Sequence, residues 1–166
     1  MKRLIFLFSF IGFSILSQAQ TDADISPSQR FKLFPQAKLL LADSVHFFTK
    51  SDLKKNKPVL MIVFNPDCGH CQHETEALLK VIDKFKGIQI IMATMAPLYE
   101  MNQFVKDYKL DQYKNITVAK DVSYYLPTYY KIYNLPFLAF YDKKFNLLSD
   151  FSGTMPMADV LKVFGR

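Results

Sequence analysis

The feature that most constrains the fold is an unbroken apolar run, Val59–Phe64, rich in branched residues. Such a run is typical of a strand buried on both faces, as found in parallel sheets that helices cover. Asn65-Pro66-Asp67 ends the run. Apolar residues then recur at helical spacing as far as Phe85, ahead of Gly87. The centre of the chain is therefore predicted to be a strand, a turn and a helix.

The rest of the chain repeats this alternation of strands and helices. Further strands are expected at 37–41, 45–48, 88–94, 116–119, 137–141 and 147–151. Further helices are expected from Pro97, from Asp121 to about Tyr133, and over 157–164. Strands joined by helices pair in parallel, whereas the last two strands read as an antiparallel hairpin. The predicted fold class is α/β, a three-layer α/β/α sandwich with a central mixed sheet.

The N-terminus has the pattern of a secretory signal. Lys2 and Arg3 precede a short apolar run, and Ser17-Gln18-Ala19 offers the small-x-small pattern that signal peptidase accepts. We expect residues 1–19 to be a signal peptide that is cleaved before Gln20, which places the protein in the periplasm. An uncleaved anchor is the alternative, although the apolar run is short for a bilayer span.

Behind the signal, residues 20–36 read as a polar lead-in and residues 37–166 as one domain. The net charge of +6 falls to +4 when the two positive charges of the signal are removed. The lysines are scattered, whereas a nucleic-acid surface needs a basic stripe with aromatic residues among them. We therefore expect a monomeric exported domain that binds no nucleic acid.

The whole cysteine inventory is one pair, Cys68 and Cys71, at the start of the central helix. A disulfide that closes so short a loop adds little stability, so a purely structural bond is the weaker interpretation. Unpaired N–H groups at a helix N-terminus favour negative charge on the sulfur of Cys68. Cys71, one turn further on, is close enough to attack a mixed disulfide. The pair therefore predicts thiol–disulfide exchange.

A metal site is the alternative for the same segment, because His70 and His73 flank the cysteines. A closed zinc site needs four converging ligands. His73 lies two residues after Cys71, about 200° around the helix axis, so it points elsewhere. We therefore expect no metal and no cofactor.

Three short motifs carry a resemblance to a known family. Cys68-Gly69-His70-Cys71 is identical to the motif of protein disulfide isomerases. Glu74 stands three residues after the second cysteine, and the segment from Tyr130 to Pro136 leads into an apolar strand. Together they resemble the thioredoxin superfamily, and within it the exported TlpA/ResA-like thiol–disulfide oxidoreductases. The resemblance covers about residues 37–164 and implies a thioredoxin-like fold.

The resemblance implies catalytic roles for Cys68, Cys71, Glu74 and Pro136. Pro136 would have a cis peptide bond that aims the Leu135 backbone at the substrate beside Cys68. Glu74, which matches the active-site acid of this branch, would shuttle a proton to or from Cys71.

Residues next to the cysteines would tune the pair. His70 would stabilise the neighbouring thiolate and make the disulfide more oxidising. Asp67, where the family usually has Trp, would act in the opposite direction or cap the helix, and Gly69 completes the motif. Ile62 stands where thioredoxin has a buried acid, and Phe137 follows the proline where Thr is usual.

These observations predict an enzyme, a periplasmic protein-disulfide oxidoreductase that acts on cysteines of other exported proteins. The family implies a reducing direction and a redox donor or acceptor upstream, which we expect to be membrane-bound. A disulfide oxidase or isomerase, suggested by His70, stays open as an alternative. A redox-inactive binding or chaperone module is a further alternative. A peroxiredoxin is disfavoured, because no Thr lies three residues before Cys68.

Overall fold

The computed structural model describes residues 25–166, so the predicted signal peptide 1–19 lies outside the described residues. The strands are β1 (Leu39–Leu41), β2 (Phe47–Phe48), β3 (Val59–Phe64), β4 (Gln89–Thr94), β5 (Ile116–Lys120), β6 (Phe137–Tyr141) and β7 (Leu147–Ser152). The α-helices are α1 (Pro27–Phe31), α2 (Gly69–Lys80), α3 (Leu98–Asp107), α4 (Tyr125–Tyr130) and α5 (Met157–Val163). Short 3-10 helices are η1 (Lys50–Asp52), η2 (Ile82–Phe85) and η3 (Leu110–Gln112).

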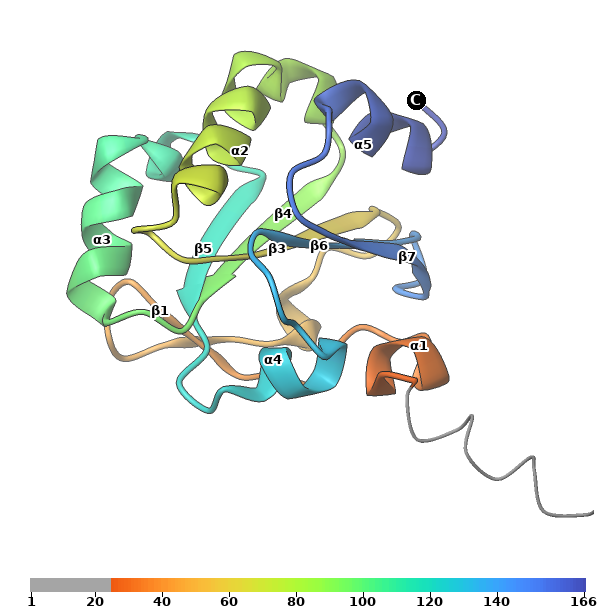
Figure 1. Ribbon diagram of the computed structural model, residues 1–166, viewed down its shortest axis with the longest axis horizontal. Helices are drawn as coiled ribbons and strands as arrows, with labels where there is room; N and C mark the ends of the chain where they lie inside the picture. The colour runs from red at the N-terminus through yellow and green to blue at the C-terminus, as the bar shows by residue number, and fades with distance from the viewer. Residues whose placement is uncertain (1–24) are drawn as a thin grey trace, which may run out of the picture.

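The strands of residues 25–166 form one seven-stranded sheet with the order β2-β1-β5-β4-β3-β6-β7. β3, β4 and β5 pair in parallel, and the remaining pairs are antiparallel. Helices α2, α3 and α5 cover one face of the sheet, and α1 and α4 lie on the other (Figure 1). The predicted three-layer sandwich with a mixed sheet is confirmed. In the described part of the chain, no helix has the length and apolar character needed to span a bilayer.

The central strand β3 is buried on both faces, and its pairing with β6 brings two turns to the same end of the sheet. All six of its residues are buried, as its unbroken apolar sequence predicts. Leu60, Ile62 and Phe64 belong to the core under α2 and α3, while the residues that alternate with them face the core under α4. Because Val63 pairs with Phe137, the turn after β3 and the turn before β6 lie at the same end of the sheet.

Helix boundaries are where the structure departs from the predictions. The predicted central helix stops as an α-helix at Lys80, because Val81 leaves helical geometry (φ −128°, ψ 21°), and η2 continues the chain. The helix expected from Asp121 to Tyr133 is only α4. Residues in left-handed conformation, Tyr124 and Lys131, flank it on both sides.

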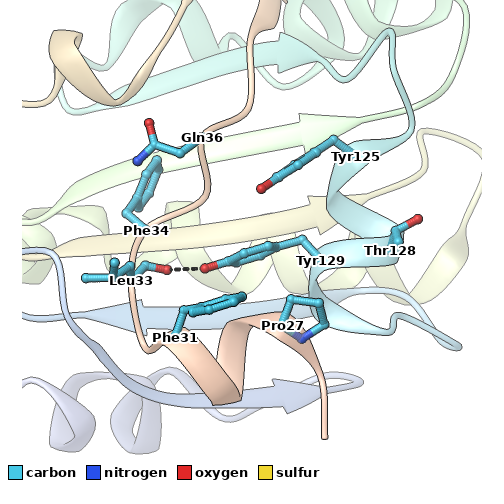
Figure 2. Close-up of a pocket in the computed structure, with 8 residues that line it drawn as sticks. All are labelled: Pro27, Phe31, Leu33, Phe34, Gln36, Tyr125, Thr128 and Tyr129. Atoms are coloured by element: carbon cyan, nitrogen blue, oxygen red, sulfur yellow. Dashed lines mark hydrogen bonds between the residues drawn. The ribbon is translucent and has the colours of Figure 1, made fainter. Parts of the chain in front are cut away.

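Helix α1 lies inside the polar segment 20–36 and was not predicted from the sequence. Ser26 caps it by accepting a hydrogen bond from the Gln29 N–H, and Pro27 occupies its first turn. The chain that follows packs on α4, where the Tyr129 hydroxyl donates to the Leu33 carbonyl at 2.6 Å (Figure 2). The two segments enclose a groove lined by aromatic side chains, among them Phe34 and Tyr125. Phe31, at the edge of this groove, is largely exposed.

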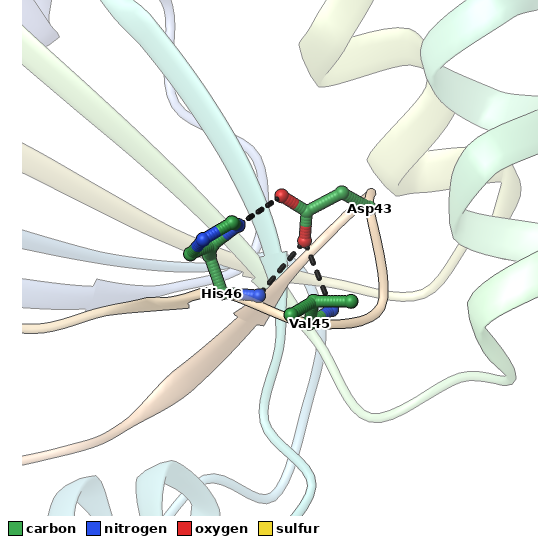
Figure 3. Close-up of polar contacts among 3 residues, drawn as sticks. All are labelled: Asp43, Val45 and His46. Atoms are coloured by element: carbon green, nitrogen blue, oxygen red, sulfur yellow. Dashed lines mark hydrogen bonds and ion pairs between the residues drawn. The ribbon is translucent and has the colours of Figure 1, made fainter.

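Two aspartates shape turns by accepting hydrogen bonds from backbone N–H groups of residues that follow them, one in buried and one in exposed surroundings. Asp121 is fully buried, and its carboxylate accepts from the Ser123 N–H and hydroxyl and from the Leu126 N–H at 2.7–3.2 Å. Asp43 is exposed between β1 and β2, and it accepts from the Val45 and His46 N–H groups and contacts the His46 ring (Figure 3). These hydrogen bonds lower the pKa of Asp43 to about 2.

We predict that Asp121→Ala lowers the free energy of unfolding by about 3 kcal/mol, because it leaves buried donors without acceptors. Urea denaturation measures the loss. Asp43→Ala is the matched control: it removes the same kind of turn bonds where water can replace them, so its loss is smaller. Equal losses for the two variants would contradict the importance given to the buried carboxylate.

Candidate functional site

Cys68 sits at the point where the chain leaves β3 and enters α2. It is the N-cap residue of α2 (φ −85°, ψ 112°), and its side chain makes no capping hydrogen bond. Asn65 shapes the turn: its side-chain oxygen accepts from the Asp67 N–H at 2.9 Å, and its carbonyl accepts from the Cys68 N–H at 3.1 Å. Cys68 is therefore half-buried at the N-terminal end of α2.

Cys71 lies one turn further along α2 and is buried, with 1% of its surface exposed. Both cysteines are free thiols. Burial raises the pKa of Cys71 to about 12, and a hydrogen bond to the Cys68 side chain adds to the rise. The charges of Cys68 and Glu74 act in the same direction, against a hydrogen bond with the Asn65 backbone. The buried thiol is thus kept protonated at neutral pH, while the outer one is accessible.

The Leu135–Pro136 step lies beside Cys68, although it is far away in the sequence. Its peptide bond is cis, as the resemblance predicts. The Cys68 thiol donates to the Leu135 carbonyl with a separation of 3.8 Å. Pro136 is buried and Leu135 is half-buried. The backbone that the resemblance assigns to the substrate is therefore next to the accessible thiol.

Glu74 is a buried carboxyl group in the second turn of α2, with 3% of its surface exposed. Its two oxygens accept from the Met155 N–H at 3.2 and 3.4 Å. Burial raises the pKa of Glu74 to about 7, and the Met155 hydrogen bond opposes this rise. The alternative that Glu74 complements the helix dipole does not fit, because the first turn of α2 contains no acid.

The residues predicted to tune the pair lie on the outside. His70, Gly69 and Asp67 are exposed, and a Cβ at Gly69 would meet nothing within 4 Å. The alternative role of Asp67 as the helix N-cap is wrong, because that position belongs to Cys68. Ile62 lies in the same apolar core as Cys71, so β3 brings no acid to this position.

Among residues 25–166, no three His, Cys, Asp or Glu side chains are grouped so that they could hold a metal ion. His73 is exposed on α2. The groups that the structure brings together at this site are two thiols, one carboxyl group and the backbone at Leu135 and Pro136.

The hydrogen-bond donors that hold these groups in place were not predicted from the sequence. The Gln72 side chain donates to the Pro66 carbonyl at 2.8 Å and fastens the turn to α2. The Met155 N–H reaches Glu74 from the segment between β7 and α5. A backbone donor leaves no signal in residue type, so only the structure could identify it.

Comparison with known proteins gives a consistent result. The model of the AhpC/TSA family matches residues 32–155. Among solved structures, DsbF of MTB is 21% identical (TM-score 0.66; 78% of this chain and 93% of that chain covered). A secreted Mycobacterium tuberculosis disulfide oxidoreductase homologous to E. coli DsbE is 19% identical (TM-score 0.65; 78% and 95%). StoA from Bacillus subtilis is 14% identical (TM-score 0.61; 80% and 98%).

No curated protein gives a significant sequence match. The structural neighbours bear out the predicted thioredoxin-like fold, in which two cysteines lie close together.

The raised pKa of Glu74 predicts how stability depends on pH. The value of about 7 lies above the ordinary 4.5, so the carboxyl group stabilises the fold below pH 4.5, and this contribution is lost as the pH rises through 7. The amide side chain that Glu74→Gln introduces cannot ionise. Between pH 4.5 and 8, the unfolding free energy of this variant should therefore rise by about 3 kcal/mol relative to that of the unsubstituted protein. Denaturant titrations at both pH values measure this difference. The exposed Glu76→Gln on the same helix is the control, and an equal gain there would refute the assignment.

Proposed function

The chain belongs to the AhpC/TSA family, and from this premise we propose that it is a thiol–disulfide oxidoreductase that reduces disulfides of other exported proteins. One observation carries the proposal: Cys68 is accessible at the start of α2 beside the Leu135 carbonyl, whereas Cys71 is buried next to Glu74. An outer thiol that attacks and an inner thiol that resolves are what dithiol exchange requires.

In the first step, the substrate disulfide docks against the Leu135–Pro136 backbone. Cys68 lies at the N-terminus of α2, where the helix dipole favours an attacking group that carries negative charge. The Cys68 thiolate attacks one substrate sulfur, forming a bond between Cys68 and the substrate while the substrate disulfide breaks. The other substrate sulfur leaves as a thiolate and takes a proton from solvent.

In the second step, Cys71 gives its proton to the ionised Glu74 and attacks the Cys68 sulfur. The bond between Cys68 and the substrate breaks, and the second substrate sulfur leaves as a thiolate that takes the proton held by Glu74. The substrate thus carries away two electrons, and the protein holds a Cys68–Cys71 disulfide. Two causes of the high pKa of Cys71 are the hydrogen bond and the charge of Cys68. Both are lost once Cys68 is in a mixed disulfide, which brings the two proton affinities closer together. A dithiol of a membrane-bound donor restores the protein by the reverse exchange.

The proposed location outside the cytoplasm rests on the N-terminal pattern of Lys2, Arg3 and Ser17-Gln18-Ala19. It is supported by the description of one structural neighbour as a secreted disulfide oxidoreductase. An exported compartment is also where substrate disulfides form and persist.

A second candidate function, disulfide oxidation or isomerisation, is favoured by His70 inside a motif shared with disulfide isomerases. The midpoint potential of the Cys68–Cys71 pair separates the two functions. A value of about −270 mV supports the reductant, and a value of about −180 mV supports the isomerase. Peroxide reduction is not proposed, because the residue three positions before Cys68 is Asn65, and its side chain is occupied in the turn.

We predict that Cys71→Ser accumulates mixed disulfides with exported proteins, because Cys68 can still attack but nothing resolves the product. Cys68→Ser, the matched control, accumulates none, because Cys71 is buried. Non-reducing gels and mass spectrometry of the trapped bond at residue 68 measure this. Equal trapping by both variants would contradict the assigned order of attack.

Insulin reduction separates the enzyme from a binding module with vestigial cysteines. The unsubstituted protein should reduce insulin with dithiothreitol as donor, and the Cys68→Ser protein should not. An unsubstituted protein without activity above the uncatalysed rate would favour the binding module.

A further inference from the structure

One short segment, Ser152–Met155, runs from the last residue of β7 toward α5 (Figure 1). It makes hydrogen bonds both to the turn before β6 and to Glu74. The Ser152 hydroxyl donates to the Asn134 carbonyl at 3.3 Å. The Gly153 N–H donates to the Pro136 carbonyl at 2.7 Å. Two residues later, the Met155 N–H donates to Glu74. The turn beside Cys68 and the buried acid are therefore fastened to the same stretch of backbone.

The Met155 N–H has a strong effect on the proton affinity of Glu74, because the carboxyl group that it contacts is buried. Glu74 is buried, and within residues 25–166 its carboxylate accepts hydrogen bonds from this one N–H. A donor to the charged form of a buried carboxyl group lowers its proton affinity, against the effect of desolvation. Loss of this donor would leave Glu74 protonated at neutral pH and unable to accept a proton.

The titratable groups near Glu74 are the two cysteines of the site. The titratable group that faces it is Cys71 on its own helix, with Cys68 beyond. The segment Ser152–Met155 contains no titratable side chain, and β3 contributes apolar residues to this core. The proton affinity of Glu74 is therefore decided by burial and by the Met155 N–H.

We propose that Ser152–Met155 is a positioning segment for the exchange reaction, in which the Met155 N–H stabilises the ionised form of Glu74 beside Cys71 while Gly153 fixes the Leu135–Pro136 backbone. The proposal deepens the proposed function and rests on it in one respect, that Glu74 accepts the proton of Cys71. Met155 acts through its backbone N–H, so a side chain of similar volume, packed on the same core, should preserve the effect.

The local conformation explains how the segment reaches both partners. Gly153 has φ +109°, in a region that side chains rarely adopt. This turn lets the N–H of Gly153 point to Pro136 and the N–H of Met155, two residues later, point to Glu74. A side chain at position 153 would strain the turn and displace the donor.

The test measures the titration of the Glu74 carboxyl carbon by NMR in the reduced protein. Met155→Pro removes the N–H, so the midpoint should move upward from about 7 by about one pH unit. Met155→Leu keeps the N–H and a similar volume, so its midpoint should stay with that of the unsubstituted protein. A Met155→Pro midpoint equal to that of Met155→Leu would overturn the proposal.

A second pair of variants covers the case in which Met155→Pro fails to fold. Gly153→Ala should also raise the Glu74 midpoint, whereas Gly165→Ala, which strains a positive φ of 71° near the C-terminus, should not. An unmoved midpoint in Gly153→Ala would overturn the proposal by itself.

The pH profile of insulin reduction is read in the same variants. If the Glu74 midpoint moves but the profile does not, the positioning stands and the proton-accepting role of Glu74 falls. If the midpoint does not move, the positioning fails whatever the activity does.

Discussion

Burial of a thiol and a carboxyl group in one apolar core is the constraint on which the site depends. Desolvation is the largest cause of the raised pKa of both Cys71 and Glu74, and it favours the neutral form of each. Two neutral acids side by side would be inert. Here the carboxyl pKa is brought near 7 while the thiol stays far higher, so one group is ready to accept what the other must release. Burial of Glu74 therefore lowers the free energy of unfolding at neutral pH, but it places a proton acceptor inside the protein.

The sheet topology explains why groups so distant in sequence share this site. β6 pairs antiparallel with β3, so the chain reaches β6 through a turn that lies beside the exit of β3. Cys68 and Leu135 meet for this reason. β7 then pairs with β6, and its exit leads back past Pro136 to Glu74. Three chain segments thus converge at one end of the sheet, and each is fixed by strand pairing rather than by loop contacts alone.

Much of this arrangement could be predicted from the sequence, and the exceptions have physical reasons. The run Val59–Phe64 predicted a buried central strand because its apolar residues do not alternate with polar ones. The family resemblance, and not residue type, predicted the cis bond before Pro136. The predicted length of the helix at α4 was wrong, because Asp121 forms a buried turn that the spacing of apolar residues does not reveal. α1 was missed although Ser26-Pro27 carries a capping signal. The burial of Glu74 depends on tertiary packing, so its sequence position alone left two roles open.

The most direct test of the account is the pH dependence of the resolving step. When the reduced protein meets an aromatic disulfide such as dithiobis(nitrobenzoate), attack by Cys68 releases one coloured thiolate, and attack by Cys71 on the mixed disulfide releases a second. Stopped-flow absorbance separates the two phases. If Glu74 accepts the Cys71 proton, the second rate rises with pH and levels off with a midpoint near 7. A rate that shows no midpoint there and climbs about tenfold per pH unit into the alkaline range would mean that Cys71 loses its proton to solvent, which would contradict the account.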